Sequence, residues 1–246
     1  KRSKPESWLK PVLIAFVSSL ILGLLLPQTF GDGLHIGAII GVLLAAWIVL
    51  SSVVNLRDKV RNAATLMQGL RRLTPSYYGM LTAHIGFACS VLGVAMVTSF
   101  NHEQDIRMTV GERTESAFSY SVSFDSIQAI SGPNYQGQRG TFSLWKDGEF
   151  IAEMHPEKRR YHARSSQVMT EAAIDAGLMR DVFIALGEPV GKDAWAVRVH
   201  VKPFIRWIWL GALLMALGGL LAICDKRYRP KQKAIIDGNG DRSATV

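Results

Sequence analysis

A histidine inside a long apolar run is the residue of this sequence best placed to do chemistry. His84 lies six positions into the run Tyr78–Phe100, roughly 9 Å from its start at the rise of a helix. An ionisable side chain at that depth in a membrane span is costly and by default indicates function. A neutral imidazole is a good ligand for haem iron. The alternative is a histidine hydrogen-bonded to a neighbouring helix, and the residues alone leave both interpretations open.

The helical position of His84 separates it from the small residues of the same run. Gly79, Ala83 and Gly86 form a row that we expect to pack closely against another helix. At the helical rotation of about 100° per residue, His84 points roughly 140° away from that row. The opposite face should therefore present the histidine beside an apolar wall with room for a flat ring. That wall comprises Met80, Phe87, Ala88, Val91 and Ala95.

The sequence offers no second ligand for a low-spin haem iron beside His84. His35 is the only other histidine near an apolar run, and it lies at the far end of the run Leu34–Leu56. The two differ in depth by roughly 20 Å, which is too far for two imidazoles on one iron. If His84 binds haem, the other ligand must come from another chain or from a part of the protein absent here. His35 itself is expected to be an interfacial side chain.

A basic and aromatic stretch, His155–His162 followed by Arg164, is the second candidate site. Lysine and arginine pair with carboxylates, so this stretch is a candidate contact for haem propionates or for an acidic partner. The alternative is a solvated loop. A zinc site is not expected, because the two histidines have no acidic or cysteine companion at ligand spacing. The candidate contact residues are His155, Lys158, Arg159, Arg160 and Arg164.

Four apolar runs must position these residues, and each is about long enough to cross a bilayer. The predicted spans are about 8–26, 34–56, 78–100 and 204–224. Lysine and arginine gather before the first span, in the loop 57–77 and in the tail 225–246, and basic flanks favour the cytoplasm. The net charge of +8 is therefore a topology signal, and nucleic-acid binding is not expected.

Residues 101–203 are then expected on the outer side, which is the periplasm of a Gram-negative bacterium. This segment is close to neutral, with twelve basic and fourteen acidic residues in 101–202. Alternation of apolar and polar residues predicts strands, and Asp147-Gly148 predicts a two-residue hairpin turn. We expect four transmembrane helices with a small antiparallel β-rich domain, a sandwich or open barrel, between the third and fourth. The expected strands are Phe118–Asp125, Phe142–Lys146, Glu149–Met154, Asp181–Leu186 and Trp195–Lys202, and Thr170–Ala176 is expected to form one or two helical turns.

Several classes of chemistry are not expected from this composition. The two cysteines lie within or at the end of apolar runs without a C-x-x-C pair, which argues against a disulfide framework, a thiol-redox site or covalent haem attachment. There is no Ser-His-Asp arrangement, no pair of catalytic carboxylates and no glycine-rich phosphate loop. Because the chain begins at Lys1 without a methionine, we expect that it was cut from a longer protein or processed.

Several blocks of the sequence, taken in order, resemble the C-terminal part of the CcmF family of cytochrome c-type biogenesis proteins. They are spread over roughly residues 10–230, and their combination is specific although no single block is. The blocks are Arg71–Leu73, Tyr78–Met80, Ala83–Gly86, Gly132–Tyr135, Arg139–Phe142, His155–Tyr161, Met169–Ile174 and Val201–Trp209.

The resemblance implies a subunit of the bacterial inner-membrane haem lyase, which attaches haem to C-x-x-C-H motifs of apocytochromes c at the outer face. In that family two histidines in membrane spans ligate a b-type haem, and His84 matches one of them. The other ligand lies upstream, as do a tryptophan-rich outer segment and its two flanking histidines. The implied partners are the haem-carrying chaperone, the thiol-handling subunit and the apocytochrome, besides the surrounding lipid.

Two hypotheses about function follow. In the first, the chain contributes the axial ligand His84 to a b-type haem and docks a partner or the apocytochrome through its outer domain. In the second, it is a non-catalytic membrane scaffold for the other maturation subunits. The segment by itself is not expected to be catalytic, because it holds no complete catalytic set.

Overall fold

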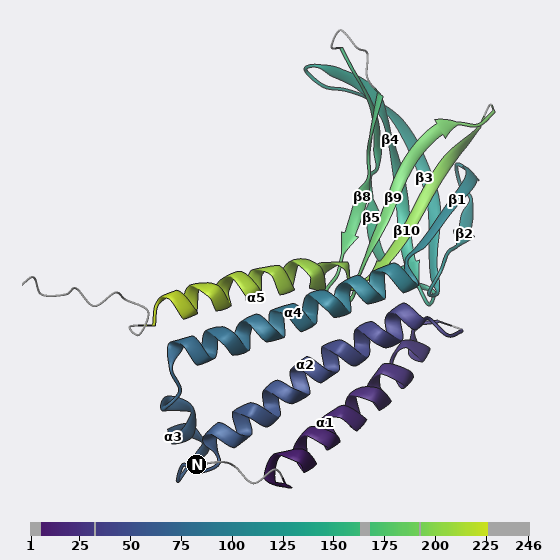
Figure 1. Ribbon diagram of the computed structural model, residues 1–246. Coiled ribbons are helices and arrows are strands. Elements are labelled where there is room, and N and C mark those ends of the chain that lie inside the picture. Colours follow the sequence, from purple (N-terminus) through teal and green to yellow (C-terminus); the bar gives the residue numbers. More distant parts are fainter. Residues whose placement is uncertain (1–5, 32, 163–167, 192, 226–246) are drawn as a thin grey trace, which may run out of the picture.

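Four long helices and one β-sandwich make up the chain in the computed structural model (Figure 1), which describes residues 6–31, 33–162, 168–191 and 193–225. All four predicted spans are helical, and each is long and apolar enough to cross a membrane. The expected tail 225–246 lies outside the described residues, apart from its first residue. The long helices are α1 (Glu6–Leu25), α2 (Ile36–Val60), α4 (Pro75–Phe100) and α5 (Ile205–Ile223). The short helices are η1 (Pro27–Thr29) and α3 (Leu66–Arg71).

Close helix packing follows the predicted row of small residues on α4. A Cβ atom added to Gly79 would lie 2.5 Å from the carbonyl oxygen of Gly218, and one added to Gly86 would lie 2.6 Å from that of Gly211. Helices α4 and α5 therefore approach each other almost backbone to backbone, which is the arrangement that small residues permit in lipid. On another side of α4, Gly41 of α2 packs against Ala95 in the same way.

The segment between α4 and α5 forms a sandwich of two antiparallel sheets. The four-stranded sheet has the order β1-β10-β9-β8, and the six-stranded sheet has the order β2-β3-β4-β6-β7, with β5 paired to β4. The strands of the first sheet are β1 (His102–Thr109), β8 (Ala173–Ala176), β9 (Arg180–Pro189) and β10 (Ala194–Pro203). Those of the second are β2 (Arg113–Glu115), β3 (Tyr120–Ser131), β4 (Tyr135–Lys146), β5 (Glu149–Met154), β6 (Glu157–Tyr161) and β7 (Val168–Glu171).

The alternating residues form the core between the two sheets, as expected. Val122, Phe124 and Phe142 are fully buried, and the two phenylalanine rings stack with their centroids 4.5 Å apart. The facing side chains from the other sheet include Val197 and Val199 of β10. Because one face of each sheet is apolar, packing the two faces together removes both from water and sets the register of the strands.

The turns and strands of the sandwich confirm one local prediction and correct two others. Asp147 and Gly148 both have positive φ, as the two-residue turn between β4 and β5 requires. Phe118 also has positive φ and lies in a turn, so the strand predicted from that residue begins at Tyr120 instead. The expected helical turns over Thr170–Ala176 are wrong: this segment forms β7 and β8, one in each sheet, because pairing with β6 and β9 overrides its local preference.

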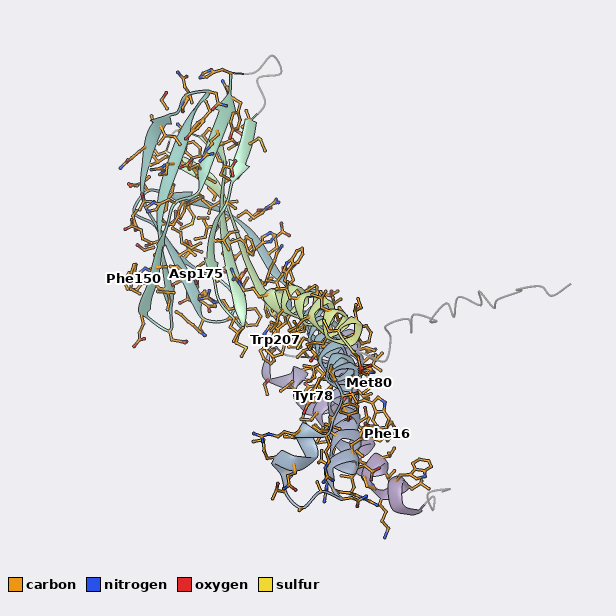
Figure 2. All side chains as sticks on the ribbon, turned by 90° about the vertical axis from the view of Figure 1, so that its left-hand side faces the viewer. Phe16, Tyr78, Met80, Phe150, Asp175 and Trp207 are labelled. Carbon is orange, nitrogen blue, oxygen red and sulfur yellow. The ribbon has the colours of Figure 1, made fainter. Side chains whose placement is uncertain are left out.

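The sandwich is fixed to the helices through the β8–β9 turn and the start of α5. The side chain of Arg206 donates to Asp181 at 2.8 Å, and the indole of Trp207 donates to the carbonyl of Leu178 at 3.1 Å. Figure 2 shows Trp207 at this junction, with the sandwich on one side and the helices on the other. Arg206 and Trp207 therefore tie α5 to the sandwich, whereas Trp209 is exposed.

Candidate functional sites

His84 lies on the face of α4 that no other described helix covers. Its side chain is exposed, whereas Gly79 and Gly86 face α5. Its Nδ1 atom lies 2.8 Å from the carbonyl oxygen of Met80, one turn earlier in the same helix. A carbonyl oxygen only accepts hydrogen bonds, so this contact places a proton on Nδ1, and in the neutral ring it leaves the lone pair of Nε2 free. The ring is therefore oriented with Nε2 as the nitrogen that could bind a metal.

The apolar surroundings of His84 are partly those that the sequence predicts. Met80 and Phe87 are exposed beside it, but Ala88 is buried and Ala95 packs against α2. A groove of about 490 Å³ begins at Phe87 and runs between α2 and α4. Its small and apolar lining leaves space along the helices for a flat apolar group. The groove is lined by Gly37, Ile40, Gly41, Phe87, Ser90, Val91, Val94, Ala95, Thr98 and Ser99.

His35 lies far from His84 along the helices. Its ring contacts that of Phe100, with the centroids 4.6 Å apart, at the opposite end of α4. Phe100 follows His84 by sixteen residues, which corresponds to about 24 Å along the helix axis. The two imidazoles therefore cannot bind one iron. Among the described residues there is also no group of three or more His, Cys, Asp or Glu side chains that could hold a metal ion.

The basic stretch is not a single cluster, and its middle is not a loop. Residues Glu157–Tyr161 form β6, which pairs with β4 and β7. Successive side chains of a strand point to opposite faces, so Lys158 and Arg160 point toward the other sheet while Arg159 lies on the outer face. His155 precedes the strand and has its Nε2 atom 3.0 Å from Glu153. Arg164 lies outside the described residues.

A group of charged side chains lies on the outer face of the six-stranded sheet. Only some of its members belong to the basic stretch His155–His162. Glu157 is 6% exposed and accepts hydrogen bonds from Arg139 at 2.6 Å and from Arg159 at 2.7 Å. The Arg159 guanidinium also lies 4.6 Å from the centre of the Tyr135 ring. Burial by itself raises the pKa of Glu157, but the hydrogen bonds from Arg159 and Arg139 outweigh it and lower that pKa below its usual value.

The roles of Arg139, Tyr135 and Glu157 were missed in the sequence. Arg139 and Tyr135 belong to β4, and the register of β4 with β6 places them opposite Glu157 and Tyr161. No local pattern encodes that register, because about twenty residues, including the whole of β5, separate the paired positions. The one available signal is that Glu157 is the acidic residue inside an otherwise basic run.

Comparison with known proteins agrees with this architecture. Residues 99–203 match the family described as the CcmF C-terminal β-sandwich. The chain is 44% identical over 234 residues to the cytochrome c-type biogenesis protein CcmF of Pseudomonas fluorescens, an alignment that covers 95% of this chain and 35% of the relative. It is 38% identical over 230 residues to the CcmF of Escherichia coli (strain K12), covering 94% of this chain and 34% of the relative. The chain belongs to the CcmF family.

The fold is also found in a solved CcmF structure. A chain titled Cytochrome c Heme Lyase CcmF superposes with a TM-score of 0.69 at 18% sequence identity, covering 91% of this chain and 36% of that one. At this identity the match shows the fold: four long helices with the sandwich before the last. The chain spans about a third of the length of the CcmF proteins that it matches.

Proposed function

We propose that this chain is the C-terminal part of a haem lyase that matures c-type cytochromes, and that His84 is one axial ligand of its b-type haem. Membership of the CcmF family supports the first half of the proposal, since relatives are named for cytochrome c-type biogenesis and a solved member for haem lyase. The observation that carries the second half is the hydrogen bond from His84 Nδ1 to Met80. When bound, a b-type haem supplies a one-electron redox centre in the membrane.

The protein groups around His84 fit one side of such a haem. The Nδ1 hydrogen bond fixes the tautomer and the ring plane and raises the basicity of Nε2, as carbonyl partners do for ligating histidines. The exposed Phe87 and the groove beyond it offer apolar contact for a porphyrin face. The described residues contain no second imidazole at the depth of His84, so we propose that the other ligand comes from residues outside this chain.

The sandwich is proposed to lie in the periplasm, with the basic ends of the helices in the cytoplasm. This orientation rests on the distribution of lysine and arginine in the flanks. It places the sandwich on the side where apocytochromes receive haem. We propose that it meets the haem chaperone, the thiol-handling subunit or the apocytochrome there.

The test of the ligand role is the absorbance spectrum of the full-length protein with His84→Ala. We expect loss of the b-type haem bands or a drop in haem stoichiometry, because Ala removes the only imidazole on this face of α4 among the described residues. The matched control is His35→Ala, which removes a histidine of the same spans but at the other end of α4 and should leave the spectrum unchanged. Unchanged bands and stoichiometry in His84→Ala would rule out the ligand role.

The scaffold hypothesis remains a second candidate because the sandwich carries its most unusual polar features far from the helices, as argued below. In that case the chain binds other maturation subunits while the haem chemistry takes place elsewhere. Co-purification of the thiol-handling subunit with this segment alone would favour it. If binding required the upstream helices, the scaffold role of this segment would be excluded.

A further inference from the structure

Polar side chains from both sheets line a gap at the end of the sandwich farthest from the helices. This gap, called here the distal cleft, has a volume of about 370 Å³. Trp195 of β10 forms part of the wall of the cleft. Pro203, at the junction with α5, follows Trp195 by eight residues, which corresponds to about 26 Å along β10. The cleft is lined by Gln136, Gly137, Gln138, Lys158, Arg159, Arg160, Val168, Glu188, Pro189 and Trp195.

The distal cleft interrupts the apolar pattern of the sandwich interior. Along β4, Phe142 and Leu144 point inward and are fully buried. The same alternation, continued toward the start of β4, places Gln138 and Gln136 on the inward face as well. Their partners across the ladder on β6 are Lys158 and Arg160. Inward positions of a sandwich are normally apolar, and departures from that rule concentrate at functional sites.

Lys158 of the distal cleft forms an ion pair with Glu188 of the other sheet. The Lys158 ammonium lies 2.5 Å from Glu188 of β9, and the lysine side chain is 13% exposed whereas that of Glu188 is 75% exposed. Glu188 lies at a β-bulge: Leu186 pairs with Val197 and Pro189 with Trp195, so two residues of β9 face Ala196 alone. Bulges re-aim side chains and occur next to functional sites. The carboxylate of Glu188 thus forms an ion pair with Lys158, while most of the Glu188 side chain stays exposed to water.

We propose that the distal cleft binds a carboxylate of an extended acidic peptide segment from a partner protein, and that this carboxylate displaces Glu188 from Lys158. The cations Lys158 and Arg160 would hold the carboxylate, and the amides Gln136 and Gln138 would bond to peptide groups beside it. Trp195 is 9% exposed and otherwise packed into the core, so it offers a small apolar edge to one neighbouring side chain. The lining is too polar for a porphyrin, which needs two broad apolar walls. This proposal deepens the docking role proposed for the sandwich and is independent of the haem role of His84.

If the peptide carboxylate displaces Glu188, then removing the cations and removing Glu188 should change the affinity for an acidic peptide in opposite directions. The probe is a fluorescein-labelled hexapeptide of alternating Glu and Gly, and its neutral counterpart has Gln in place of Glu. Binding is followed by fluorescence anisotropy with the full-length protein in nanodiscs. We expect Lys158→Gln with Arg160→Gln to weaken binding of the acidic peptide about tenfold or more, and Glu188→Gln to strengthen it several-fold, because the competing carboxylate is gone.

The matched control is Lys146→Gln, which removes an exposed positive charge from the opposite end of β4, eight residues from Gln138, and should leave the affinity unchanged. The circular dichroism of every variant reports whether the sandwich stays folded. Equal affinity for the acidic and neutral peptides would overturn the proposal, as would unchanged or weaker binding in a folded Glu188→Gln variant. Because the haem spectrum is recorded separately, failure here is distinguishable from failure of the ligand role of His84.

Discussion

His84 donates its Nδ1 hydrogen to a carbonyl group of its own helix, 2.8 Å away at Met80. The ring therefore needs no neighbouring helix to satisfy that nitrogen, and its second nitrogen is available on an exposed face. For a histidine within a span, this leaves a polar atom without a described partner, which is costly in lipid unless something else binds it. An iron ion of a haem meets that requirement chemically, since neutral imidazole nitrogen is a common haem ligand.

Glu157 gives a prediction about stability at the scale of one residue. Replacing it with Gln removes the charge that Arg139 and Arg159 share, and we expect this to cost the sandwich about 2 kcal/mol at neutral pH. The measurement is thermal unfolding of the full-length protein, followed by the circular dichroism of its β-structure. Glu153→Gln is the control, because Glu153 is an exposed residue on the adjoining strand β5 and should change stability little.

The same substitution has an expected pH dependence. The pKa of Glu157 is lowered in the folded protein, so its contribution is complete above the unfolded value of about 4.3 and is lost as the pH falls through the folded value. The difference between wild type and Glu157→Gln should therefore shrink below about pH 4. A difference that stayed constant down to pH 3 would mean that the ionised carboxylate is not what stabilises this part of the sheet.

At the scale of the element, two faces of helix α4 have different surroundings. One face packs against α5 through glycines, and the other presents His84. We expect Gly86→Val to destabilise the helix pair by about 1–3 kcal/mol, because a side chain there would meet the backbone of α5 near Gly211. The measurement is the fraction of monodisperse protein recovered in detergent after heating. Gly219→Val is the control, since a Cβ atom at Gly219 has no neighbour within 4 Å, and equal losses in both variants would contradict close packing at Gly86.

The elements show which parts of the structure could be predicted from local sequence. The long apolar runs became helices, and alternation with an Asp-Gly turn predicted the hairpin of β4 and β5, because these features depend on residues close together in the chain. The strands β7 and β8 were missed because their partners β6 and β9 impose the extended conformation. The distal cleft was missed for the same reason: Lys158 and Glu188 meet only after both sheets have assembled.

At the scale of the whole molecule, the described contacts make the sandwich and the helices one connected unit. Asp181 is central to this, because its buried carboxylate accepts from Arg206 of α5 and from the backbone of Gly177. We expect Asp181→Ala to loosen the β8–β9 turn and to raise its amide hydrogen-exchange rate about tenfold, measured by mass spectrometry. The control is Asp105→Ala, which breaks an exposed pair with Arg198. No change in exchange at the turn would show that other contacts hold the junction.

The central claim is that His84 binds the iron of a b-type haem, with the second ligand supplied by residues outside this chain. The most direct test is the absorbance spectrum of full-length protein carrying His84→Gly, recorded without and then with added imidazole. Glycine leaves space at the site, so free imidazole can replace the missing side chain. We expect the low-spin b-type bands to be lost in the variant and restored by imidazole. Full bands in the variant without imidazole would contradict the claim.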